Sequence, residues 1–131
     1  MSTPEKRKDP RVKVFYPISY VCRDGKGSIV HQSTGMALNI SQSGILIETA
    51  NSVFFKHITL ICVGLNKHNI EINGKVAYCK KKESEKYRVG IRFEDTYEQN
   101  INFVKEITRA YFYSKDKYHY DSVSNGKTAA I

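Results

Sequence analysis

The feature that most constrains the fold is an alternation of apolar and polar residues that recurs along most of the chain. It is clearest in the segment YRVGIRFE, where Tyr87, Val89, Ile91 and Phe93 alternate with charged residues and a glycine. A period of two places successive side chains on opposite faces of a strand, so that one face is buried and the other exposed. Residues 87–93 are therefore predicted to form a half-buried strand whose inner row is apolar.

Similar patterns predict the other strands, and the polar, glycine-containing segments between them predict turns. The even positions from 12 to 22 form an apolar row, and Pro17 beside it indicates a strand edge or a bulge. In a later strand, one face is expected to carry four apolar or aromatic residues, Ile70, Ile72, Val76 and Tyr78. Six or seven short antiparallel strands without intervening helices favour a small β-barrel over a parallel sheet. The predicted strands are 12–22, 28–32, 36–40, 45–49, 57–65, 69–81 and 87–93.

The period changes after Phe93. Asp95 or Thr96 can cap a helix, with Glu98 or Gln99 completing a capping box. Apolar residues then recur at helical spacing, which predicts one amphipathic helix to about Tyr113. The fold class is thus mainly β, a small antiparallel barrel with a C-terminal α-helix. Residues 1–10 are expected to form a flexible arm, 11–113 the barrel and helix, and 114–131 a disordered tail.

Several function classes find no support in the 131 residues. There is no apolar run long enough to cross a membrane and no apolar core of a secretory signal near the start, so we expect no membrane insertion and a cytoplasmic location. The three cysteines lie in apolar strand-like segments, which favours reduced core thiols over disulfides or zinc ligands. No spacing suggests a metal site or a nucleophile with its base, so we expect no cofactor and no enzyme.

The formal net charge of +8 favours an anionic partner. Part of the excess lies in the run Lys80, Lys81 and Lys82 between two predicted strands, followed by Glu83. Such a run is also typical of a solvated hairpin loop. Charge alone therefore leaves the identity of the anion open.

Two short segments carry candidate binding residues. In RKDPR, Arg7 and Arg11 are four residues apart on the predicted arm, and each guanidinium can bind a guanine edge or a phosphate with two hydrogen bonds. In NISQSG, Asn39 offers an amide and Ser41 a hydroxyl. Gly44 permits either a backbone conformation or a close approach that other residues do not allow. Taken singly, the segments also fit a solvated basic terminus and an ordinary serine-rich turn. Their joint presence, before a barrel and a helix, favours a site.

The pattern of RxxxR, then NxSxxG, then GILIET and YRVGIRFED leading into a helix resembles the PilZ domain family. The resemblance spans residues 6–113. It implies a six-stranded β-barrel with a C-terminal helix, which agrees with the fold class predicted from the residue patterns. It also implies that the protein is a bacterial receptor for the second messenger cyclic di-GMP, in processes such as motility or biofilm control, and not an enzyme.

The resemblance assigns roles to the matching residues. Arg7 and Arg11 would fold over cyclic di-GMP from the arm and contact guanine edges and phosphates, while Asn39, Ser41 and Gly44 would form the half of the site on the barrel. Lys6, just before the first arginine, occupies the position that helps to set whether one ligand or an intercalated pair binds, and its charge favours the pair. Ser43 stands where many relatives have another glycine.

We expect ligand binding to order the arm and to signal to a downstream protein whose identity the sequence does not reveal. Two alternatives remain. One is a PilZ-like adaptor that binds a protein partner without nucleotide. The other, less favoured, is a small basic barrel that binds single-stranded nucleic acid through Lys80 to Lys82 and exposed tyrosines.

Overall fold

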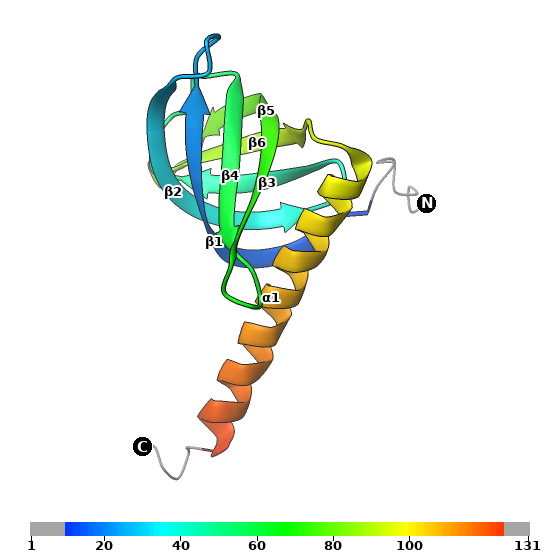
Figure 1. The fold of residues 1–131 in the computed structure, drawn as a ribbon. Helices are drawn as coiled ribbons and strands as arrows, with labels where there is room; N and C mark the ends of the chain where they lie inside the picture. The colour runs from blue at the N-terminus through cyan, green and yellow to red at the C-terminus, as the bar shows by residue number, and fades with distance from the viewer. Residues whose placement is uncertain (1–9, 125–131) are drawn as a thin grey trace, which may run out of the picture.

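The computed structural model describes residues 10–124, and in the last helix it describes side chains only as far as Ser114. Six strands are followed by one helix (Figure 1). They form a closed antiparallel barrel in the order β1-β2-β3-β6-β5-β4, which confirms the predicted fold class. The elements are β1 (Val12–Arg23), β2 (Ile29–Ile40), β3 (Gly44–Thr49), β4 (His57–Val63), β5 (Asn69–Lys81), β6 (Tyr87–Phe93) and α1 (Tyr97–Ser124).

The two strands predicted at 28–32 and 36–40 are one continuous strand, β2. The intervening residues pair with β1, with Ser33 opposite Tyr20 and Gly35 opposite Ile18. Gly35 does not interrupt the strand, because its missing side chain leaves room for the main-chain carbonyl of Glu48 on β3. A glycine that indicated a break is therefore a point of close strand approach.

Pro17 lies at a strand edge, as its residue type predicted. It pairs with Met36 on β2, whereas the pairing of β1 with β4 begins only at Ser19. Proline donates no main-chain hydrogen bond and is tolerated where one side of a strand has no neighbour. The Tyr16 hydroxyl donates to the carbonyl of Val63 at 2.8 Å and so links the separated ends of β1 and β4.

The core lies inside the barrel and consists of the inner rows that the alternation predicted. Val89, Ile91 and Phe93 are buried, as the period of β6 requires. The buried Tyr20 hydroxyl is hydrogen-bonded to Thr49 Oγ1 at 3.0 Å, which satisfies a polar group that would otherwise be costly to bury. All three cysteines are free; Cys22 and Cys62 are buried and Cys79 is half-buried, which agrees with their prediction as core thiols.

The start of α1 has the predicted capping box. The main-chain amide of Gln99 donates to Thr96 Oγ1 at 3.1 Å, and the amide of Thr96 donates to Gln99 Oε1 at 3.0 Å. Beyond the cap, Phe103 and Ile107 are buried, and the rings of Phe103 and Phe93 meet edge to face with centroids 5.8 Å apart. The first half of the helix therefore belongs to the core of the barrel.

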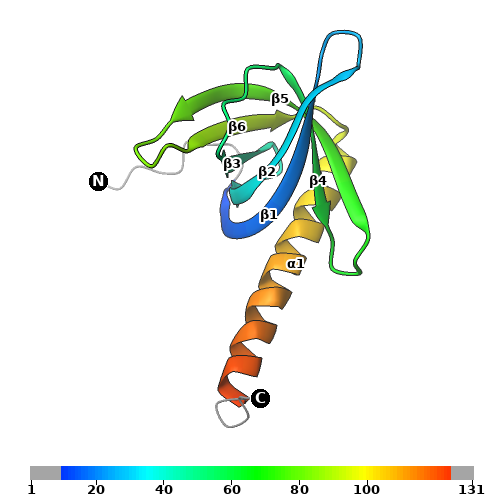
Figure 2. The same cartoon turned by 90° about the vertical axis from the view of Figure 1, so that its left-hand side faces the viewer.

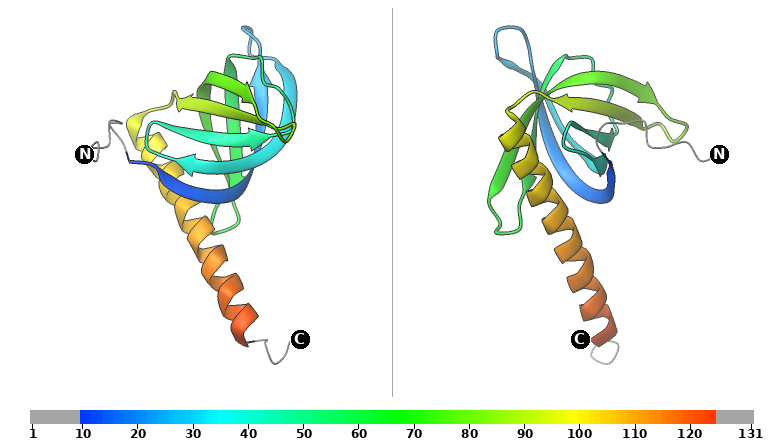
Figure 3. Two further views of the ribbon diagram at one scale, coloured as in Figure 1. Left: turned by 180° about the vertical axis from the view of Figure 1, so that it is seen from behind. Right: turned by 90° about the vertical axis from the view of Figure 1, so that its right-hand side faces the viewer.

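The end of α1 differs from the prediction. The helical backbone continues past Tyr113 to Ser124, into the segment assigned to a disordered tail, and extends away from the barrel (Figures 1 and 3). No glycine, proline or asparagine occurs between Tyr113 and Ser124, so the residues that commonly end helices are absent from this segment. Within residues 10–124, no helix is long and apolar enough to cross a membrane.

Candidate functional site

Residues on the outer face of five neighbouring strands line up in a single row. Lys13 on β1 lies opposite Asn39 on β2, and Asn39 lies opposite Leu46 on β3. Leu46 lies opposite Gly90 on β6, and Gly90 lies opposite Tyr78 on β5. Directly opposed residues are near neighbours on the face of a sheet. This outer row therefore brings together residues that are far apart in the sequence.

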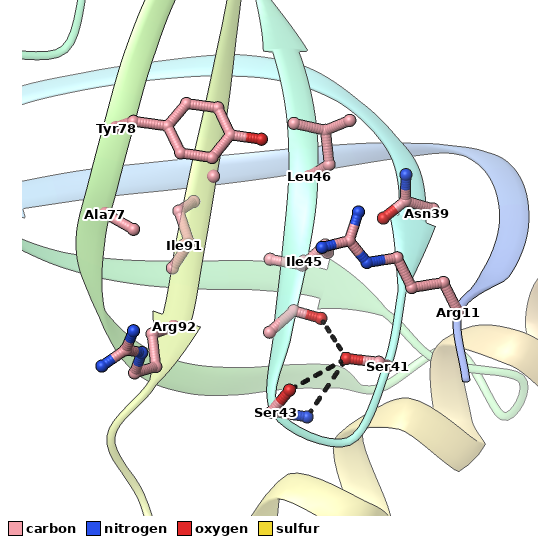
Figure 4. Close-up of a pocket in the computed structure, with 12 residues that line it drawn as sticks. Arg11, Asn39, Ser41, Ser43, Ile45, Leu46, Ala77, Tyr78, Ile91 and Arg92 are labelled. Carbon is pink, nitrogen blue, oxygen red and sulfur yellow. Dashed lines mark hydrogen bonds between the residues drawn. The ribbon is translucent and has the colours of Figure 1, made fainter. Parts of the chain in front are cut away.

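A cavity of about 290 Å³ is centred on the outer row (Figure 4). Arg11 and Asn39 lie on one side of it, Tyr78 and Arg92 on the other, and Leu46 between them. No aspartate or glutamate is among its lining residues in the part of the chain that the structure describes. The two arginines therefore make it a polar, cationic depression on the outside of the barrel.

The segment NISQSG forms the end of β2, a tight turn and the start of β3. The Ser41 amide donates to the carbonyl of Gly44 at 2.9 Å, and the Ser43 amide donates to Ser41 Oγ at 3.3 Å. Ser41 Oγ is also 3.2 Å from Ser43 Oγ (Figure 4). The Ser41 side chain is buried and shapes the turn, and Ser43, where a second glycine is common, takes part in the same bonds.

Gly44 is required by close packing of two main chains. A Cβ atom at this position would overlap the carbonyl oxygen of Ile91 on β6. The Phe93 amide also donates to the Ser43 carbonyl at 2.9 Å, so the turn is bonded directly to the end of β6. Of the two reasons for a glycine considered from the sequence, close approach is the one that the structure supports.

Tyr78 lies on the outer face of the barrel. The prediction that it belongs to the inner row of β5 is therefore wrong. The pairing with β6 shifts at this point, because Val76 lies opposite Ile91 but Tyr78 lies opposite Gly90. Ala77 is thus a β-bulge, which reverses the faces of the residues that follow. Tyr78 is 43% exposed, and Cys79 takes the inward place instead.

The Tyr78 ring lies over Gly90. A Cβ atom at position 90 would approach the ring carbon Cζ to 2.6 Å, so only glycine leaves the ring in this place. Sequence reasoning missed Tyr78 as a site residue, although a glycine inside the otherwise regular β6 was a signal of close approach. It also missed Arg92, which pairs with Gly44 across β3 and β6.

Four of the six sequence-predicted site residues meet at this cavity: Arg11, Asn39, Ser41 and Gly44. Arg11 precedes β1 and its side chain reaches toward Asn39 (Figure 4). Lys6 and Arg7 lie outside the described residues. The two segments RKDPR and NISQSG are therefore joined in space through Arg11.

A second cavity, of about 470 Å³, is larger, but its acidic side chains already interact with neighbouring residues. Its Asp95 carboxylate accepts hydrogen bonds from the main chain and the side chain of Asn73, at 2.9 and 3.3 Å. Glu94 lies 3.6 Å from Lys75 Nζ and 3.7 Å from His57 Nδ1. The acidic residues of this cavity therefore already have partners, whereas the described residues that line the outer-row cavity include two arginines and no carboxylate. Among the side chains that the structure describes, up to Ser114, no cluster of three or more metal-binding groups occurs.

Comparison with known families decides the identity of the fold. The PilZ domain model matches residues 5–112, which is most of the chain. The chain belongs to the PilZ family. The RxxxR and NxSxxG segments and the residues that line the outer-row cavity all lie within the matched range. No curated protein matches the sequence.

Solved structures share this PilZ fold at low sequence identity. The Bacillus subtilis inhibitor of motility MotI/DgrA has a TM-score of 0.57 and 16% identity over 80% of this chain and 50% of that one. The PilZ domain of Escherichia coli YcgR with c-di-GMP has a TM-score of 0.56 and 11% identity over 88% of this chain and 98% of that domain. The K. pneumonia MrkH-c-di-GMP complex has a TM-score of 0.56 and 16% identity over 86% and 55%. This chain thus spans about half of MotI/DgrA and MrkH.

Proposed function

We propose that this PilZ protein is a receptor for cyclic di-GMP. The observation that carries the proposal is the cationic cavity in which Arg11, Asn39, Ser41 and Gly44 meet. These residues come from the two segments singled out by their binding chemistry, and two of the similar structures, the YcgR domain and MrkH, are complexes with c-di-GMP. The ligand carries two phosphates and two guanines, so a site for it needs cations, amides and a flat apolar surface.

The cavity offers each of these groups. The Arg11 guanidinium can bind a phosphate or a guanine edge with two parallel hydrogen bonds. The Asn39 amide can both donate to and accept from a guanine edge. The exposed face of Tyr78 can stack against a base, a contact worth about 1–3 kcal/mol. Arg92 supplies a second positive charge beside the turn.

Ser41 acts mainly through the turn in this proposal. Its hydroxyl is engaged with Ser43 and with the main chain of the turn, so it holds the backbone of Ser43 and Gly44 in place. A ligand atom at the turn can then be met by main-chain groups that are already oriented. Such groups cost little further entropy on binding.

The arm completes the site. We expect residues 1–10 to fold over the bound ligand, with Arg7 adding a second guanidinium and Lys6 influencing whether one ligand or a pair is bound. Ordering the arm costs part of the interaction energy and converts ligand binding into a change of surface. A downstream protein would recognise that change. No catalysis and no cofactor are part of this function, and a cytoplasmic location fits a receptor for an intracellular messenger.

Calorimetric titration with cyclic di-GMP tests the proposal directly. We expect saturable binding, and the stoichiometry separates one ligand from a pair. Arg11→Ala and Arg7→Ala should each weaken binding by about 1–3 kcal/mol, or about five- to 150-fold, and leave the melting temperature of the unliganded protein unchanged. The matched control is Arg109→Ala, an exposed arginine on α1.

Three results would overturn the proposal. Absence of heat at tens of micromolar ligand would favour an adaptor that does not bind nucleotide. Tight, steeply salt-dependent binding of a single-stranded oligonucleotide would favour the nucleic-acid alternative. Unfolding of the Arg7→Ala or Arg11→Ala variant would mean that the arm belongs to the core.

A further inference from the structure

The second half of β5 has an open strand edge. β4 pairs with β5 only as far as Lys75, and from Ala77 to Lys81 the described chain pairs β5 with β6 alone. Figures 2 and 3 show the end of the β5–β6 hairpin extending beyond the rest of the barrel. On this side, alternate main-chain amides and carbonyls between Ala77 and Lys81 are available to another extended chain, because the groups between them face β6.

The same hairpin carries most of the excess charge of the protein. Residues 75–92 contain seven basic and two acidic residues, a net charge of +5 out of +8 for the chain. Lys80 and Arg88 lie directly opposite each other across β5 and β6, as do Lys75 and Arg92. Like charges directly opposite each other repel and destabilise a sheet. An anion bound beside the hairpin would reduce this repulsion.

The acidic residues nearby neutralise only part of this charge. Glu48 lies 3.3 Å from Arg88, and Glu85 lies 3.3 Å from Lys81. Among described residues, Lys80 and Lys82 have no carboxylate partner; the Lys80 ammonium lies over the Tyr78 ring, 5.5 Å from its centroid. A strand placed along the edge would therefore find unpaired lysines beside its main chain.

The composition of the hairpin end distinguishes between possible anionic partners. Residues 80–86, KKKESEK, contain no apolar side chain that could insert into a lipid layer. Single-stranded nucleic acid stacks successive bases on several rings, whereas Tyr78 is the one aromatic residue between Ala77 and Lys82. An extended protein segment needs main-chain partners, and the open edge provides them. Lysines on an edge also prevent pairing between identical copies, because the copies repel each other.

We propose that the β5 edge from Ala77 to Lys81 binds an extended acidic segment of a partner protein as an added strand. Main-chain hydrogen bonds provide the pairing, and lysines on both faces of the strand select carboxylates. Because the edge is present without a nucleotide, this proposal stands apart from the proposed receptor function. Binding is therefore measured on the full chain in the absence of cyclic di-GMP.

The probe is a short fluorescent peptide in which aspartate or glutamate alternates with threonine or valine, followed by anisotropy. We expect saturable binding that weakens as salt is raised. The Lys80→Glu/Lys82→Glu variant should lose about tenfold or more in affinity. The matched control, Lys26→Glu/Lys105→Glu, makes the same change of net charge at exposed positions away from the hairpin and should bind like the wild type.

A second peptide separates strand addition from simple attraction of charges. It has the same sequence, with alternate main-chain nitrogens methylated so that one edge cannot donate hydrogen bonds. We expect this peptide to bind about tenfold or more weakly, and we expect the amides of Cys79 and Lys81, which face the open edge, to gain protection from hydrogen exchange only with the parent peptide. Equal binding of the two peptides would overturn the proposal. So would equal losses in the two double variants, or tighter binding of phosphatidylglycerol vesicles or oligothymidine at the same edge.

Discussion

Gly90 is the residue on which the position of Tyr78 depends, because the tyrosine ring occupies the space of the missing side chain. Gly90→Ala should displace the ring from the outer row. We expect cyclic di-GMP affinity to fall by about tenfold, since a stacked base contributes about 1–3 kcal/mol. Calorimetry of the variant measures the loss. Gly25→Ala is the control, because nothing lies within 4 Å of a Cβ atom there.

Gly44→Ala should have a different consequence from Gly90→Ala. Here the new Cβ would meet the main-chain carbonyl of Ile91, and a main chain cannot move aside as a tyrosine ring can. We expect the free energy of unfolding to fall by about 1–3 kcal/mol, together with a loss of ligand affinity. Urea unfolding of both variants tests the distinction. An unchanged stability for Gly44→Ala would show that β3 and β6 are less closely packed than described.

At the scale of elements, the capping box sets the start of α1. Thr96→Ala removes the hydroxyl that accepts from the Gln99 amide and disrupts the reciprocal bond. The expected cost is about 1 kcal/mol of stability, measured by denaturant unfolding. Asn102→Ala, an exposed change within the same helix, should be neutral or slightly stabilising. A similar loss in both variants would mean that the cap contributes nothing specific.

The elements also show where sequence reasoning works. Local periodicity located the strands, although it divided β2 into two, and the cap of α1, because burial of one face and the residue types of a cap are local properties. It could not give the order of the barrel, since Glu48 and Arg88 pair across 40 positions. Asn39, Ser41, Gly44 and Arg11 were found from short segments. Tyr78 was missed because the bulge at Ala77 depends on the pairing of β5 with β6 and leaves no local pattern.

At the scale of the whole molecule, the buried thiol of Cys62 makes stability depend on alkaline pH. Burial raises the pKa of Cys62 to about 12, against about 8.5 in an unfolded chain. Because the folded pKa is the higher one, this contribution to stability is fully present below about pH 8.5 and is lost as the pH rises toward 12. Each unit of difference is worth about 1.4 kcal/mol, so the full loss is on the order of 5 kcal/mol.

Urea unfolding at several pH values between about 8 and 11 tests this dependence. The wild type should lose stability more steeply than Cys62→Ala, whose lower overall stability does not affect the comparison of slopes. Lysines and tyrosines that titrate in this range are common to both proteins. Parallel slopes would show that the Cys62 thiol ionises as easily in the folded protein as in the unfolded one.

The outer row and the core use alternate residues of the same strands, and this arrangement has an evolutionary consequence. A substitution at Asn39 or Leu46 changes the surface that a ligand meets, while the inward neighbours Ile40, Ile45 and Ile47 stay in place. Binding preference can then drift one mutation at a time through intermediates that all remain folded. A scaffold of this kind keeps its shape while the surface residues diverge, as expected for barrels that superpose at 11–16% identity.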